Sequence, residues 1–75
     1  MKIYPNPAND RVTIENKYKE SFILKIYDLM GTLVRNELIQ GDKKQINVED
    51  LSNGVYVLEF ISKEKSLQER LIIHR

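Results

Sequence analysis

Three features of the sequence predict an all-β fold, an antiparallel sandwich or barrel. Apolar and polar side chains alternate at a period of two in several stretches, as they do in strands with one buried face. The expected strands start roughly ten residues apart, a spacing that favours antiparallel connections over helix-linked parallel ones. Turn-forming residues separate them. The expected strands cover residues 2–4, 11–15, 22–28, 32–39, 44–48, 55–61 and 67–73.

The N-terminal part is expected to form the strands over 2–4 and 11–15. Between them, Pro5-Asn6-Pro7 predicts an extended, polyproline-like segment, because each proline fixes its own φ and restricts the residue before it. Asn9-Asp10 then indicates a turn. The strand over 11–15 is supported by two alternating apolar residues, Val12 and Ile14.

The middle of the chain predicts three strands joined by tight turns. The buried face of the strand over 22–28 is formed by Phe22, Leu24 and Ile26. Asp28-Leu29-Met30-Gly31 predicts a type I turn with Asp at its first position, and Gly31 supplies the positive φ that closes such a hairpin with a bulge. Gly41-Asp42 separates the next two strands, over 32–39 and 44–48. The one helical candidate, Asn47 to Leu51, is too short to outweigh the strand before it.

A late segment, Leu51-x-x-Gly54-x-Tyr56, predicts a specific corner. In Greek-key sandwiches, a tyrosine near the start of a late strand buries its ring and donates a hydrogen bond to backbone just upstream. Gly54 would supply the bend into that strand. Tyr56 would then share the core face with Leu58 and Phe60. A plain surface tyrosine remains the alternative interpretation.

The last expected strand is basic and then aliphatic. Alternation places Leu71 and Ile73 on one face, and Arg70, Ile72 and His74 on the other. With Leu71 and Ile73 facing the core, the residues left for a partner are Arg70, His74 and Arg75.

Composition narrows the class of protein. The 75 residues suggest one domain, residues 1–75, that buries only about 60% of its unfolded surface. The formal net charge is +1 and the basic residues are dispersed, so the chain has no electrostatic footprint for nucleic acid. No apolar run reaches transmembrane length, and the first residues lack the apolar core of a signal peptide. If the domain is exported, we expect that signal to lie on a larger parent protein.

Residues typical of catalysis or metal binding are scarce, and we predict no catalytic, cofactor-binding or metal site. The only histidine is His74, there is no cysteine, and no serine lies in a nucleophile-elbow context. The acidic residues are dispersed, without the spacing of a calcium loop: Asp10, Glu20, Asp28, Asp42, Glu49 and Asp50. A glycosidase-type carboxylate pair stays open at this point, although a domain of this size offers no obvious cleft.

Four segments, in this order over about residues 3 to 75, resemble the type A C-terminal sorting domain of the type IX secretion system. They are Tyr4-Pro5-Asn6-Pro7-Ala8; Ile26, Tyr27, Asp28, Gly31 and Val34; Leu51, Gly54, Val55, Tyr56 and Leu58; and Arg70, Leu71, Ile72, Ile73, His74 and Arg75. The family often has lysine at the terminal basic position, so Glu69-Arg70 is a small departure.

The resemblance implies an immunoglobulin-like antiparallel β-sandwich of about seven strands. It implies a C-terminal export signal attached to an N-terminal cargo domain and used by Gram-negative bacteria. The expected partners are the type IX translocon and the outer-membrane shuttle and sortase components. The expected destination is the cell surface or the medium, reached through the periplasm and outer membrane. A sortase-like cysteine peptidase would then cut upstream of the Pro-Asn-Pro segment, outside this chain.

A second interpretation is an immunoglobulin-like accessory module of an extracellular protein, either carbohydrate-binding or a spacer. Carbohydrate modules stack sugars on exposed aromatic rings. The chain has no tryptophan, and Tyr56 and Phe22 are expected inside, but three further rings are candidates for exposure: Tyr4, Tyr18 and Tyr27.

Overall fold

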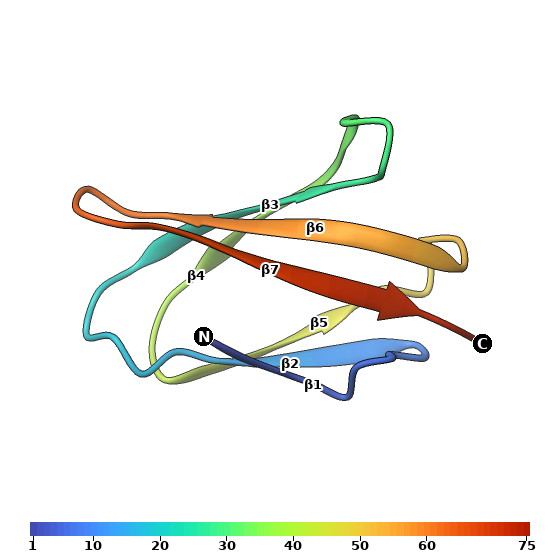
Figure 1. The fold of residues 1–75 in the computed structure, drawn as a ribbon. Coiled ribbons are helices and arrows are strands. Elements are labelled where there is room, and N and C mark those ends of the chain that lie inside the picture. Colours follow the sequence, from blue (N-terminus) through green and yellow to red (C-terminus); the bar gives the residue numbers. More distant parts are fainter.

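The computed structural model describes residues 1–75 and contains seven β-strands and no helix (Figure 1). Each expected strand is present, with ends that differ by at most one residue from the predicted ones. The prediction of an all-β antiparallel fold is therefore confirmed. The strands are β1 (Lys2–Tyr4), β2 (Arg11–Glu15), β3 (Phe22–Tyr27), β4 (Leu33–Ile39), β5 (Lys43–Asn47), β6 (Gly54–Ile61) and β7 (Ser66–Ile73).

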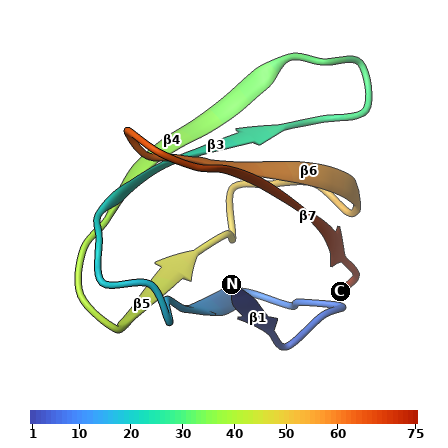
Figure 2. The ribbon, with the colours of Figure 1, turned by 60° about the vertical axis from the view of Figure 1, so that its left-hand side comes forward.

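The strands form two sheets that face each other as a sandwich (Figure 2). One sheet has the order β1-β2-β5, and the other has the order β4-β3-β6-β7. All neighbouring strands are antiparallel. The chain passes from one sheet to the other between β2 and β3, β4 and β5, and β5 and β6. These crossings give the immunoglobulin-like arrangement that the resemblance implied, and they exclude a closed barrel.

The core lies between the sheets and follows the predicted alternation. Inward side chains of β2, β3 and β6 are buried while their neighbours are at least partly exposed. On β7 only the C-terminal inward residues, Leu71 and Ile73, are buried. The rings of Phe22 and Phe60 meet edge to face within the core, with 6.5 Å between their centroids. Loop residues complete the core, among them Ala8, Val48 and Leu51. Burial of each large side chain contributes about 1.5–3 kcal/mol, which gives a domain of this size its stability.

The turn between β3 and β4 forms as predicted. Asp28 Oδ1 accepts the backbone N–H groups of Met30 (2.9 Å) and Thr32 (3.0 Å), and the backbone C=O of Asp28 accepts the Gly31 N–H at 3.0 Å. Gly31 has a φ of 85°, a conformation that side chains with a Cβ rarely adopt. The pairing of β3 with β4 shifts between Ile26 and Tyr27, which is the expected bulge.

One local feature differs from expectation. The segment Pro5-Asn6-Pro7 bends rather than running as an extended polyproline-like stretch, so that prediction is wrong. Both X–Pro bonds in this segment are cis. The bend directs Asn6 and Ala8 to the edge of the opposite sheet, where they pair with β7.

Candidate functional site

Asn6 connects the Pro-Asn-Pro segment to the last strand. Its side chain donates a hydrogen bond from Nδ2 to the Arg70 C=O at 2.8 Å, and its Oδ1 accepts the Ile72 N–H at 3.0 Å. A carboxamide holds an NH2 donor and a C=O acceptor in one plane, much as a peptide group holds its N–H and C=O. Asn6 therefore takes the place of a neighbouring strand at the edge of β7.

Ala8 continues the same pairing with its backbone. The Ala8 N–H donates to the Ile72 C=O at 2.7 Å, and the His74 N–H donates to the Ala8 C=O at 2.9 Å. The result is an isolated parallel bridge between Ala8 and Ile73. We call residues 6–8 together with residues 70–74 the terminal seam. The seam joins the two sheets and covers the C-terminal half of the β7 edge.

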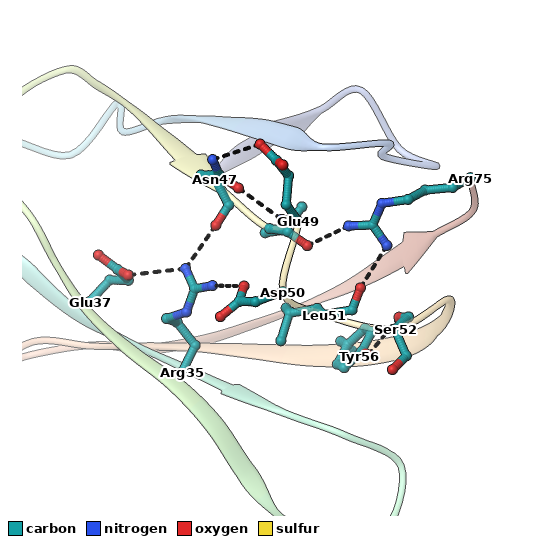
Figure 3. Close-up of polar contacts among 10 residues, drawn as sticks. Arg35, Glu37, Asn47, Glu49, Asp50, Leu51, Ser52, Tyr56 and Arg75 are labelled. Atoms are coloured by element: carbon teal, nitrogen blue, oxygen red, sulfur yellow. Dashed lines mark hydrogen bonds and ion pairs between the residues drawn. The ribbon is translucent and has the colours of Figure 1, made fainter.

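Arg75 holds the loop between β5 and β6, as Figure 3 shows in part. Its guanidinium donates to the C=O groups of Leu51 (2.6 Å) and Val48 (2.5 Å), and its Nε lies 3.1 Å from Asp10 Oδ1. The backbone N–H of Arg75 donates to Asn53 Oδ1 at 3.1 Å. The prediction that the Arg75 side chain is left free for a partner is therefore wrong. Its planar fork matches carbonyls that a turn leaves without partners.

Tyr56 forms the predicted corner. Its side chain is only 6% exposed, and its hydroxyl donates to the Ser52 C=O at 2.7 Å (Figure 3). Gly54 opens β6 with a φ of 158°, a conformation that residues with a Cβ rarely adopt, and a Cβ at this position would lie 3.9 Å from the Tyr56 ring. The surface-tyrosine alternative is excluded.

A second polar connection closes the other side of the sandwich. Arg35 on β4 is 18% exposed and donates to the Asn47 C=O of β5 at 2.9 Å and to the carboxylate of Asp50 (Figure 3). Glu37 lies 3.3 Å from Arg35 and 3.5 Å from Lys44 Nζ. Sequence reasoning missed this network. The sequence of β4 contained a signal for it. Arg35 and Glu37 occupy inward positions of this strand, whereas its outward positions are largely apolar.

Tyr4 and Glu15 form a hydrogen-bonded pair that shifts the pKa of both groups. The Tyr4 hydroxyl donates to the Glu15 carboxylate, and Lys43 Nζ lies 3.8 Å from the same oxygen. The hydrogen bond to Glu15 raises the pKa of Tyr4 above its usual value. The same bond lowers the pKa of Glu15. Both residues are half-buried and lie on the outward side of the three-stranded sheet.

The structure brings most of the predicted motif residues to one end of the sandwich. Pro5, Asn6 and Pro7 lie beside the strand that contains the terminal motif, and the late motif adjoins it, because Gly54 pairs with Ile73 and Tyr56 pairs with Leu71. As predicted, Leu71 and Ile73 are buried while Arg70, Ile72 and His74 face outward. Asp28 and Gly31 lie at the tip of the β3–β4 hairpin, which projects away from the sandwich at the same end (Figure 1).

The surface includes an apolar tip but no aromatic platform. Leu29 is 71% exposed and Met30 is 89% exposed at the β3–β4 turn. None of the six aromatic side chains is fully exposed. Tyr4, Tyr18 and Tyr27 are half-buried, and the other three are buried. No group of three or more metal-binding side chains comes together. The chain has no helix that is long and apolar enough to cross a membrane.

An antiparallel sandwich whose first and last motifs pair with each other defines a small β-domain built around its C-terminal strand. The family model described as "Secretion system C-terminal sorting domain" matches residues 2–74, and the chain belongs to this family. Its members are type IX secretion signals, which direct their cargo across the outer membrane to the cell surface or the extracellular space.

The chain is also similar to an "Endo-acting ulvan lyase" of Formosa agariphila. The two are 30% identical over 74 residues, which are 97% of this chain and 14% of that protein. The chain thus spans about a seventh of its relative.

Proposed function

We propose that residues 1–75 act as one unit, a non-catalytic export address for a cargo domain on their N-terminal side. The type IX translocon and its outer-membrane shuttle would recognise this unit. A sortase-like peptidase would then remove it by cutting upstream of residue 1. The pairing of Asn6 with β7 is the observation that best supports the proposal, because it combines the first and last motifs of the family into one surface.

The composition of that surface supports recognition rather than chemistry. The outward residues beside the seam are Arg70, Ile72 and His74, and no cluster of metal-binding side chains is present. Six motif residues contribute mainly to the structure of the domain: Asn6, Asp28, Gly31, Tyr56, Leu71 and Ile73. Their proposed role is to hold the outward residues in place for the export machinery.

The test is an export assay with a periplasm-targeted fluorescent reporter that ends in residues 1–75. In a host with the type IX system, the reporter should reach the surface or the medium. In the same host without the translocon, it should stay in the periplasm. Equal export from both strains would contradict the proposal, and a reporter without the domain provides the baseline.

Removal of the domain needs a separate measurement. The reporter should carry the natural residues that precede residue 1 in the parent protein. The exported product should then lack the domain in the parent host and retain it in a host without the peptidase. Mass spectrometry of both products distinguishes cleavage from export, and an identical mass in the two hosts would contradict the proposed removal.

A further inference from the structure

The edges of the two sheets differ in how fully they are covered. On one side of the sandwich, side chains cap the edges of β4 and β5. Lys44 Nζ donates to the Leu38 C=O of β4 at 2.7 Å, and Arg35 donates to the Asn47 C=O of β5. On the other side, β1 is only three residues long. The fourth edge is β7, which is eight residues long.

Only the C-terminal half of the β7 edge is covered. Arg70, Ile72 and His74 direct backbone groups away from β6. Asn6 and Ala8 bind the Arg70 C=O, the N–H and C=O of Ile72, and the His74 N–H. Because these groups alternate along an antiparallel strand, Ser66 and Gln68 also direct their N–H and C=O groups outward. No hydrogen bond within the chain reaches these backbone groups. The edge over residues 66–69 is therefore open.

Two charged side chains next to this open edge have no partner. Glu69 lies on the inward side of β7 and is nevertheless exposed, and Arg70 lies exposed on the outward side. Neither residue forms an ion pair within the chain. Leu67, on the inward side next to Glu69, packs partly against the core. An inward-pointing charge deters pairing with apolar strands. A strand with a residue of opposite charge beside Glu69 would avoid this penalty, because opposite charges on neighbouring strands stabilise the pairing.

We propose that the β7 edge over residues 66–69 accepts an extended strand from a protein of the export machinery. This inference rests on the proposed function. The added strand would bond to the free backbone groups of Ser66 and Gln68. It would place an apolar residue beside Leu67, a basic residue beside Glu69 and an acidic residue beside Arg70, since laterally opposite side chains on a sheet are neighbours. Asn6 ends the site at Arg70.

The experiment compares Gln68→Pro with Asn36→Pro in the exported reporter. Proline at position 68 removes an outward N–H group and leaves the bonds to β6 in place. Asn36 on β4 of the same sheet is the matched control. Leu38 directs its backbone groups outward from β4, because Lys44 binds its C=O, and Asn36, two residues away, therefore directs its N–H group outward as well. Gln68→Ala controls for the side chain, and the melting temperature of each purified variant establishes that it is folded.

Export of Gln68→Pro should fall by about tenfold, which corresponds to the loss of one hydrogen bond in the pairing, while Asn36→Pro and Gln68→Ala export normally. Normal export of folded Gln68→Pro would overturn the inference. An equal loss in Gln68→Ala would also overturn it, because the side chain and not the edge would then be recognised. Translocon-independent export of the unaltered domain would instead contradict the proposed function.

A charge-reversal variant gives an independent result if Gln68→Pro does not fold. Glu69→Lys reverses the charge of one exposed side chain that forms no ion pair within the chain. Export should fall severalfold with an unchanged melting temperature, and normal export of this variant would overturn the inference.

Discussion

The Asn6 side chain occupies the position of a neighbouring strand beside Ile72. Its Oδ1 accepts the Ile72 N–H at 3.0 Å, although the two residues are 66 positions apart in the chain. The same carboxamide donates to the Arg70 C=O. One side chain thus connects the first motif of the domain to the last, and in doing so it links the two sheets.

Replacing Asn6 with Ala removes both hydrogen bonds and exposes two backbone groups of β7 to water. We expect Asn6→Ala to lower the free energy of unfolding by about 1–2 kcal/mol. In a domain of this size, each kcal/mol lowers the melting temperature by roughly 4–8 °C. Thermal melting followed by circular dichroism measures the change. Asn9→Ala is the control, since Asn9 is exposed and its side chain forms no hydrogen bond within the chain. Equal melting of Asn6→Ala and the unaltered domain would show that the seam adds nothing.

Arg75→Ala should destabilise the domain by about 1–2 kcal/mol, because the C=O groups of Val48 and Leu51 lose charged donors. The expected loss of stability is modest because the Arg75 side chain is 28% exposed. Urea denaturation measures the change. His74→Ala should leave the midpoint unchanged, since only the backbone of His74 takes part in the seam. If the two variants had the same midpoint, Arg75 would have no structural role and would be available to a partner.

Tyr56→Phe removes a buried hydroxyl and leaves the Ser52 C=O without its partner. We expect a loss of about 1 kcal/mol or more. The control is Tyr27→Phe. The Tyr27 hydroxyl is half-buried and makes a longer contact, 3.4 Å, to Glu59. Chemical denaturation of both variants compares them directly, and a larger effect at Tyr27 would contradict the corner geometry.

The pair Tyr4–Glu15 predicts a pH-dependent contribution to stability. Because the fold lowers the pKa of Glu15, its contribution is complete above the unfolded value of 4.5 and is lost as the pH falls through the lower folded pKa. Because the fold raises the pKa of Tyr4, its contribution is present below 10.0 and is lost as the pH rises through the higher folded pKa. The difference in melting temperature between the unaltered domain and Tyr4→Phe should therefore narrow at both extremes. A difference that stays constant from neutral to strongly acidic pH would contradict this account.

The positions of the strands and the corner tyrosine were predictable because their causes are local, whereas the order of the strands within the two sheets was not predicted. A period-two pattern decides which face of β3 or β6 is buried, and Asp28 with Gly31 specifies a turn within four residues. The hydrogen-bond partners of the Asn6 and Arg75 side chains were not predictable in this way. Each makes contacts with residues far away in the chain, and nothing in the neighbouring sequence indicates the partner.

The sequence by itself therefore determined the all-β class, the positions of the seven strands, the inward face of the terminal strand and the family. Only the tertiary structure decided that Pro5-Asn6-Pro7 bends, that Asn6 pairs with β7, and that Arg75 binds the loop before β6. It also decided which half of the β7 edge stays open. The physical reason is that side-chain alternation and turn preferences act over a few residues, whereas the hydrogen-bond partners of an edge strand depend on which distant segment the packed sheets bring beside it.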